Sequence, residues 1–188
     1  MQVIFKSKLI NMTPQEIRNL RLKNDYSQMV NIRGNIINWK VVRGKPPYVE
    51  KYELTVNVKG VIGKGPRYRE THNINVVIPA NYPNAAPDIN MTSTPFVYHP
   101  NWYTGGKWCF GKWFMSEGLG EHIIRMVKTI QYDLEITNEN SPANQDANQW
   151  FLSNKNRRLF PCDNKILPDP TKKKMTINSP VKKKFDIK

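Results

Sequence analysis

Residues 98–109 read YHPNWYTGGKWC, and they begin at the end of a segment in which proline recurs every few residues. That segment, residues 79–100, contains five prolines and leaves room for one short strand, at residues 88–92. Because proline has no N–H to donate to a β-ladder, residues 79–100 are expected to form mostly extended loop. A long irregular segment inside a compact domain is usually functional. A functional site is therefore expected around this loop and the cysteine that follows it, Cys109.

Upstream of the loop, three runs of residues have the pattern of β-strands. They are residues 35–42, which are rich in Ile and Val, residues 48–58, in which apolar and polar side chains alternate, and residues 72–78. The connectors between them, residues 43–47 and 60–66, are rich in turn-forming residues. Together with the short strand in the loop, these runs predict an antiparallel four-stranded meander sheet.

Helices are expected before and after these strands. Thr13 occupies an N-cap position, with proline next and Glu16 in the capping-box position, and Gly34 ends the helix. After the loop, residues 121–135 place their apolar side chains on one face. A further helix is expected to start at Ser141, an N-cap before proline, and to extend to about residue 158. Strands followed by helices, rather than alternating with them, predict an α+β fold.

The size of the chain fits one such domain, over residues 1–160, with a basic, Pro/Lys-rich and flexible tail over residues 161–188. The mass is 21.9 kDa and the mean hydropathy is −0.62. No apolar run approaches the roughly 20 residues that a membrane-spanning helix needs, and the first residues do not read as a signal peptide. We therefore expect a cytoplasmic protein without a membrane partner, or a nuclear one in a eukaryote, given the Lys-rich tail.

Cysteine and histidine usage argues against a metal site or a disulfide framework. The two cysteines, Cys109 and Cys162, cannot build a zinc site alone, and the three histidines show no metal-ligand spacing with them. The absence of a disulfide framework indicates a reducing, intracellular environment. Each cysteine is then either a small core residue or a nucleophile. Cys162, beside a proline near the tail, is expected to be incidental.

The charge of the chain is strongly basic, with 29 Lys+Arg against 15 Asp+Glu and a formal net charge of +14. Residues 165–188 alone contain eight lysines and two aspartates. No stretch shows an RNP, zinc-finger or helix-turn-helix pattern that would turn this basicity into nucleic-acid recognition. A basic surface attracts any acidic partner, so the two Lys triplets, residues 172–174 and 182–184, fit a solvated tail or a contact with an acidic partner.

Three motifs, in order, resemble those of the ubiquitin-conjugating enzyme family. His99-Pro100-Asn101 precedes Cys109 by the family's spacing, ten residues from His to Cys. Tyr82-Pro83, with a further proline four residues on, is similar to the element after the family's third strand. Residues 138–147 resemble the family's Ser-Pro-Ala-Asn segment. The resemblance covers about residues 13–160 and implies a UBC-like fold.

The activity that the resemblance implies is a thioester relay. An activating enzyme would use ATP to load the C-terminus of ubiquitin, or of a ubiquitin-like protein, on its own cysteine. Cys109 would accept that acyl group and pass it to an amine, usually a lysine of the target. A thiolate attacks a thioester readily and leaves readily, so one cysteine serves both half-reactions. This chain would need no cofactor and no metal, while Lys107 and Lys112 would favour the thiolate if they lie near it.

The resemblance also implies roles for three further residues. Asn101 matches an asparagine credited with oxyanion stabilisation, loop positioning, or both. Ser141 matches a position that gates the site, and because serine is a weak base it would position the incoming amine. Tyr103 matches a tyrosine of the SUMO-conjugating branch that helps to desolvate the acceptor lysine, which lowers the pKa of that lysine.

Each candidate also has a purely structural interpretation. Cys109 could be an inert buried thiol, Ser141 only an N-cap, and Tyr103 a residue that packs the loop. His99 is expected to be hydrogen-bonded within the loop rather than to act as a base. His122 is expected to be a partly exposed helix residue, since a protease pair of His122 with Cys109 has no accompanying signature.

Two positions depart from the family's pattern. Asn84 stands where an aromatic residue is usual, and Glu117-Gly118-Leu119 stands where Trp-Ser-Pro is usual. Those two loops are the usual docking surface for ligases, so any ligase partner is expected to be non-standard. Two other functions stay open: a catalytically silent scaffold of the same fold that binds ubiquitin-like proteins, and a basic nucleic-acid-binding protein.

Overall fold

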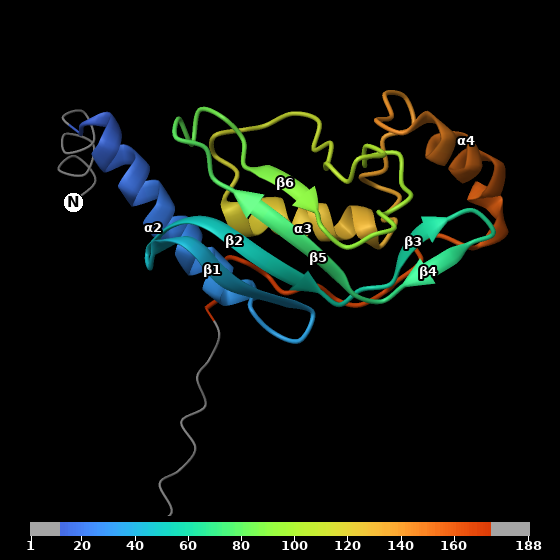
Figure 1. Cartoon of the computed structure of the whole chain (residues 1–188), viewed down its shortest axis with the longest axis horizontal. Helices are drawn as coiled ribbons and strands as arrows, with labels where there is room; N and C mark the ends of the chain where they lie inside the picture. The colour runs from blue at the N-terminus through green and yellow to red at the C-terminus, as the bar shows by residue number, and fades with distance from the viewer. Residues whose placement is uncertain (1–11, 174–188) are drawn as a thin grey trace, which may run out of the picture.

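The computed structural model describes residues 12–173. Its elements are α2 (Pro14–Ile32), β1 (Ile37–Lys45), β2 (Tyr48–Val56), β3 (Gly60–Gly63), β4 (Arg67–Arg69), β5 (His72–Val77), β6 (Asp88–Met91), α3 (Leu119–Ile130), α4 (Gln145–Asn154) and the 3₁₀ turn η1 (Lys155–Arg157). Figure 1 shows α2 at one end of the molecule, α3 behind the sheet, and α4 at the other end beside β3 and β4. None of these helices has the length and apolar character that crossing a membrane requires.

The main sheet confirms the predicted antiparallel meander. Its four strands lie in the order β1-β2-β5-β6. Along β2, Tyr52, Leu54 and Val56 are buried, whereas the residues between them are partly exposed. The alternation expected for a half-buried strand is therefore present, with one face of the sheet turned to the core.

The first helix begins as the sequence predicts. The Thr13 side chain accepts the N–H of Glu16, and the Glu16 carboxylate accepts the N–H of Thr13 at 2.7 Å, which completes a capping box. The helix ends at Ile32, with Arg33 as C-cap, two residues before the glycine that was expected to end it.

The connector expected to be only a turn, residues 60–66, instead contributes to a second, two-stranded sheet made of β3 and β4. Val61 of β3 is completely buried and belongs to a cluster with Tyr132, Phe151 and Phe160. A four-residue strand rich in glycine gives little signal in the sequence, so packing against this aromatic cluster decides its structure.

The helix after the loop is shorter than expected. α3 covers Leu119–Ile130 rather than residues 121–135. Tyr132 adopts a left-handed backbone conformation with φ of 60°, which ends the helical path, and Leu134 beyond it is exposed. The apolar stripe of α3 therefore ends one turn early.

The last helix does not start at Ser141, which corrects the expected N-cap. α4 begins at Gln145, because the Asn144 side chain accepts the N–H of Ala147 at 3.0 Å. Ser141 lies in an irregular segment before it and is exposed.

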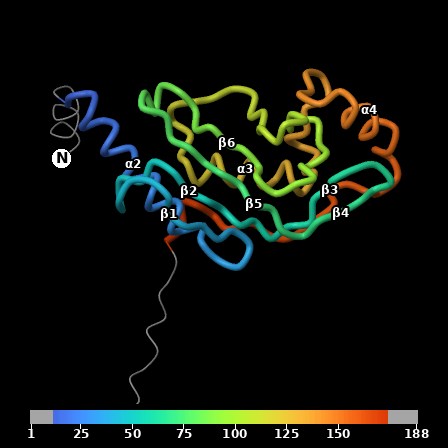
Figure 2. Tube along the Cα trace, in the orientation of Figure 1, coloured from blue at the N-terminus to red at the C-terminus, as the bar shows by residue number. Residues whose placement is uncertain are grey.

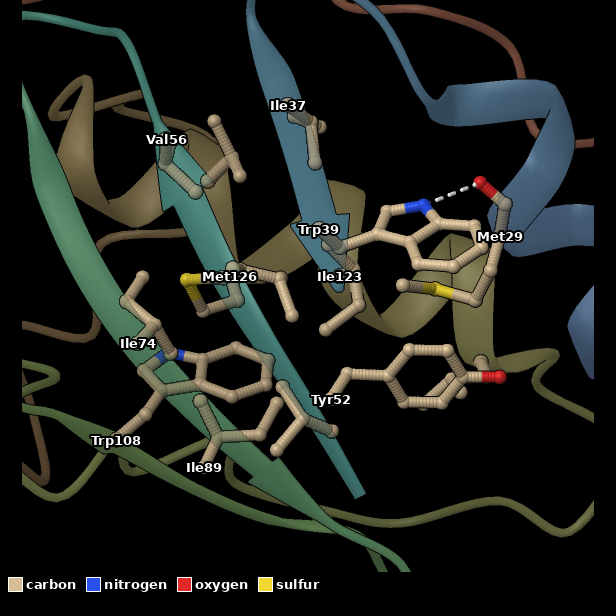
Figure 3. Close-up of a cluster of buried hydrophobic side chains, with 14 of the residues drawn as sticks. Met29, Ile37, Trp39, Tyr52, Val56, Ile74, Ile89, Trp108, Ile123 and Met126 are labelled. Carbon is tan, nitrogen blue, oxygen red and sulfur yellow. Dashed lines mark hydrogen bonds between the residues drawn. The ribbon is translucent and has the colours of Figure 1, made fainter. Parts of the chain in front are cut away.

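The core lies between the sheet and α3 (Figure 3). Ile123 and Met126 of α3 are fully buried there with Trp39 of β1 and Tyr52 of β2. The Trp39 indole N–H donates to the Met29 carbonyl O at 2.9 Å, so its one polar atom is satisfied inside the core.

A buried carboxylate joins three segments. Asp25 of α2 is only 2% exposed. It accepts hydrogen bonds from the Arg21 Nε at 2.9 Å, from the Leu119 N–H at 2.8 Å and from the Tyr82 hydroxyl. Through Asp25, α2 is tied to the start of α3 and to the Tyr82-Pro83 element.

Part of residues 161–173, which the sequence assigns to a flexible tail, contacts the body, although Ile166 is exposed. Cys162 is buried, and the Asn31 side chain donates to the Pro170 carbonyl O at 2.8 Å. The trace in Figure 2 runs from the β3–β4 side back to α2. The expected boundary at residue 160 thus falls within the packed chain, because proline-rich composition hides the apolar contacts of this segment. Residues 174–188 lie outside the described residues.

Candidate active site

A short antiparallel ladder leads to the candidate nucleophile. The Cys109 N–H donates to the Asn101 carbonyl O at 2.8 Å, and Trp102 bridges to Trp108. Side chains alternate between the two faces of such a ladder. Trp102 and Trp108 are accordingly buried, whereas Asn101 and Cys109 are partly exposed and Tyr103 is exposed. The sequence-predicted residues 101, 103 and 109 therefore share the outward face.

The ladder is fixed to the edge of the main sheet. The Trp108 N–H donates to the Ile89 carbonyl O at 3.0 Å, and the Met91 N–H donates to the Gly106 carbonyl O at 2.8 Å. Gly106 has a φ of 83°, and a Cβ there would lie 2.6 Å from the Phe96 ring. Only glycine fits position 106, because of its positive φ and its close approach to Phe96, whereas a Cβ at Gly105 would meet no other atom.

The cysteine has a tyrosine beside it. The Tyr103 hydroxyl lies close to Cys109, and the charge of an ionised Cys109 raises the pKa of Tyr103. Tyr103 therefore keeps its proton beside the cysteine. Its ring is 46% exposed, which leaves it accessible to a molecule that approaches the thiol.

The two lysines that flank Cys109 in sequence have other partners. The Lys107 ammonium lies 2.7 Å from a carboxylate oxygen of Asp88, and the Lys112 ammonium lies 5.0 Å from the centre of the Phe114 ring. The expectation that they favour the thiolate depends on their distance from Cys109 and stays a prediction. The charge of Lys107 does act at Tyr103, where it opposes the rise in the pKa of that tyrosine.

His99 is completely buried and hydrogen-bonded within the loop. Its Nδ1 accepts the Asn101 N–H at 2.9 Å, and its Nε2 lies 3.3 Å from the Thr137 hydroxyl. Burial lowers the pKa of His99 to about 3. The ring is therefore neutral at physiological pH, and its role is to hold the backbone of Asn101.

The Asn101 carboxamide faces the segment that precedes α4. Its Oδ1 accepts the Asn138 N–H at 2.9 Å, and its Nδ2 lies 3.4 Å from the Ile136 carbonyl O. The neighbouring Pro100 carbonyl O accepts the Ala143 N–H at 2.7 Å. The two motifs, at residues 99–101 and 138–147, are thus held against each other.

His122 corrects the sequence expectation, because it is completely buried rather than partly exposed. Its ring packs among the rings of Trp108, Phe110 and Trp113, at centroid distances of 4.8–5.4 Å. The periodicity of a helix cannot show that a preceding loop folds over one of its residues. His122 makes no hydrogen bond to Cys109: Nδ1 faces Glu117, and Nε2 has no partner in the described part of the chain.

The carboxylate of Glu117 fixes the segment that follows the cysteine. It accepts two hydrogen bonds from Arg125, each at 2.8 Å, while Arg125 also donates to the Phe110 carbonyl O. Burial raises the pKa of Glu117, but the hydrogen bonds from His122 and Arg125 outweigh it and lower the pKa to about 2. Glu117 therefore has a structural role through its ion pair with Arg125, which the spacing of residues in the sequence did not reveal.

This ion pair predicts an acid-dependent loss of stability. In the folded chain the pKa of Glu117 lies below its ordinary value of 4.5. The contribution of Glu117 to the free energy of unfolding is therefore complete above pH 4.5 and is lost as the pH falls toward 2. Urea unfolding at about pH 6 and about pH 3 should show that the stability advantage of the wild type over Glu117→Gln shrinks with acid. An advantage of the same size at both values would contradict the assignment.

The comparison of the sequence with known families shows the family to which this chain belongs. The family model described as ubiquitin-conjugating enzyme matches residues 21–161. The chain belongs to the ubiquitin-conjugating enzyme family. Among solved structures, human ubiquitin-conjugating enzyme E2 G1 is similar, at 12% identity and a TM-score of 0.47, over 64% of this chain and 98% of that chain. No curated protein matches the sequence.

Within this ubiquitin-conjugating enzyme fold, the departure from the family pattern at residues 117–119 has structural partners. Gly118 begins α3 as its N-cap, and its N–H donates to the Glu121 carboxylate at 2.7 Å. Arg21 of α2 donates to the carbonyl groups of Met115 and Glu117. The loop at residues 115–119 is therefore bonded to α2.

Two groups near the site were missed from the sequence. Thr137 bonds to His99, and the Asn138 side chain bonds to the backbone of Ser141. An asparagine three residues before a serine-proline pair is a recognisable turn signal, and it could have identified Asn138. In residues 12–173, no group of three or more His, Cys, Asp or Glu side chains could hold a metal ion.

Proposed function

We propose that this ubiquitin-conjugating enzyme family member is catalytically active, with Cys109 as the carrier of ubiquitin or a ubiquitin-like protein. The main support is the ladder that presents a partly exposed Cys109 thiol on the same face as Asn101 and Tyr103. The second cysteine, Cys162, is buried, and burial raises the pKa of its thiol to about 12. Only Cys109 therefore offers an accessible nucleophile.

In the loading step, the Cys109 thiolate attacks the carbonyl carbon of the thioester on the activating enzyme. A bond from Cys109 sulfur to that carbon forms, and the activating enzyme's sulfur leaves as a thiolate. In the transfer step, a neutral target amine attacks the new thioester, the carbon–nitrogen bond forms, Cys109 leaves as a thiolate and the amine gives up a proton. Both steps pass through a tetrahedral oxyanion. ATP is used by the activating enzyme, so no cofactor is assigned to this chain.

We assign loop positioning to Asn101 in the uncharged enzyme, because its carboxamide bonds to residues 136 and 138. The Nδ2 bond to the Ile136 carbonyl O is long, at 3.4 Å, and therefore weak. Its release would free a donor for the oxyanion. The exposed Tyr103 ring would shield the incoming amine from water, which lowers the pKa of that amine, and Ser141 would position it.

The partners follow from this assignment. An activating enzyme and a modifier are required, while a ligase would meet the altered loops at Asn84 and residues 117–119. A reduced Cys109 suits the cytoplasm, or the nucleus in a eukaryote. An acidic partner of the C-terminal lysines remains a prediction, since residues 174–188 lie outside the described part.

A charging assay tests the proposed function. The chain is incubated with ATP, activating enzymes and their cognate ubiquitin-like proteins, and a gel is read with and without thiol reductant. An adduct that disappears with reductant supports the proposal and identifies the modifier. A folded chain that forms no adduct with any cognate pair would instead indicate the silent scaffold.

Asn101→Ala should slow discharge of the loaded enzyme onto free lysine by at least about tenfold while charging changes by less than about threefold. The reason is that the attacking amine requires both the oxyanion donor and an ordered loop, whereas a thiolate is an easier nucleophile. Single-turnover rates of both steps provide the measurement, with Asn140→Ala as an exposed control in the neighbouring loop. Equal losses in both steps would exclude a role specific to transfer.

A further inference from the structure

The Asn138 side chain holds the backbone of Ser141 from both sides. Asn138 Nδ2 donates to the Ser141 carbonyl O at 2.9 Å, and Asn138 Oδ1 accepts the Ser141 N–H at 3.0 Å. The amide nitrogen and the amide oxygen of Asn138 are thus both hydrogen-bonded to the backbone of the same residue. The peptide groups on either side of Ser141 are fixed by this single side chain.

The backbone of Asn138 is in turn bonded to the candidate active site. Its N–H donates to the Asn101 Oδ1 at 2.9 Å. The Cys109 N–H donates to the carbonyl O of the same Asn101, at 2.8 Å. A continuous series of hydrogen bonds therefore runs from Cys109 through Asn101 and Asn138 to Ser141.

Ser141 has few other restraints. Its side chain is exposed, and the residue after it is a proline, which has no N–H to bond. In residues 12–173, the Asn138 carboxamide provides both hydrogen bonds that the Ser141 backbone makes. The next restraint along the chain is the bond from the Ala143 N–H to the Pro100 carbonyl O.

We propose that Asn138 is a positioning residue for acyl transfer, which acts by holding Ser141 at a fixed place relative to Cys109. This inference rests on the proposed function, because it assigns Ser141 to the approach of the acceptor amine. Loading from the activating enzyme does not need that approach to be ordered. The effect of Asn138 is therefore confined to the transfer step.

The matched variants separate the two ends of the carboxamide. Asn138→Ala removes both bonds to Ser141, and Asn138→Asp keeps the acceptor for the Ser141 N–H but places an oxygen against the Ser141 carbonyl. Both leave the backbone N–H that bonds to Asn101. Asn140→Ala, at an exposed position in the same segment, is the control.

The experiment measures charging, and then single-turnover discharge onto free L-lysine across a range of lysine concentrations, with the modifier that loads on the wild type. Asn138→Ala should lower the maximal discharge rate at least about tenfold and change charging by less than about twofold. Asn138→Asp should be similarly slow in discharge, and it carries the test if Asn138→Ala does not fold. Asn140→Ala should match the wild type.

A double-mutant cycle with Ser141→Ala distinguishes positioning from a general structural effect. If Asn138 acts through Ser141, Ser141→Ala also slows discharge, and the double variant is no slower than the slower single variant. Additive losses in discharge rate would overturn the positioning role of Asn138, and so would a Ser141→Ala variant that discharges like the wild type. Neither result would affect the proposed function. A wild type that never charges overturns the proposed function and this inference with it.

Discussion

Replacing Cys109 with alanine should reduce the thiol-sensitive adduct to background while the chain stays folded. The thiol is partly exposed at the end of the ladder, so its removal leaves no buried cavity that would destabilise the fold. The loss should follow from the missing nucleophile alone. Cys109→Ser should form an adduct slowly, and that adduct should survive reductant because it is an oxygen ester. The measurement is the charging gel, together with a thermal melt of each variant.

The other cysteine provides the matched control for this experiment. Cys162 is buried, with its sulfur 3.1 Å from the Lys59 carbonyl O. Cys162→Ala should load the modifier like the wild type. An adduct that persists in Cys109→Ala and disappears in Cys162→Ala would falsify the assignment of the nucleophile.

The largest effect on stability is expected for Asp25→Ala. Asp25 is 2% exposed and accepts hydrogen bonds from Arg21, Tyr82 and Leu119. Its removal leaves a partly buried guanidinium without its charge partner and a buried N–H without an acceptor. Removing one partner of a buried ion pair typically costs about 3–5 kcal/mol of unfolding free energy. Urea unfolding followed by tryptophan fluorescence would measure this change.

An exposed ion pair is the control for Asp25. The Lys40 ammonium lies 2.6 Å from a Glu53 carboxylate oxygen on the solvent side of the sheet. Water screens surface pairs of this kind, so Glu53→Ala should leave the unfolding midpoint nearly unchanged. Similar losses from Asp25→Ala and Glu53→Ala would mean that Asp25 does not join the three segments as described.

The sequence predicts the parts of the fold that local rules control. The capping box at Thr13 and Glu16, and the alternation along residues 48–58, depend on near neighbours and are readable one segment at a time. The burial of His122 and the packing of residues 161–173 depend on segments that are distant along the chain. Composition and periodicity carry no information about those contacts.

The candidate site was predictable to a similar degree. The motif spacing indicated Asn101, Tyr103 and Cys109, and the structure brings these three residues to one face. The motif spacing could not indicate that the Asn101 carboxamide is hydrogen-bonded to residues 136 and 138, because those bonds form between two loops. The prediction that Ser141 is the N-cap of the last helix was wrong for a local reason, because the Asn144 side chain accepts the N–H of Ala147 and caps α4 instead.

The pairing register of the ladder between Asn101 and Cys109 decides whether the cysteine side chain can be reached from solvent. Opposite residues in a two-stranded ladder face the same side, and a slip of one position exchanges the sides. If the pairing slipped by one residue, the cysteine would be directed into the layer occupied by Trp108, and an indole would face solvent in its place. Because the Trp108 N–H donates to the Ile89 carbonyl O, the main sheet opposes such a slip, and the exposed turn at residues 104–105 can change in length while the sulfur stays reachable.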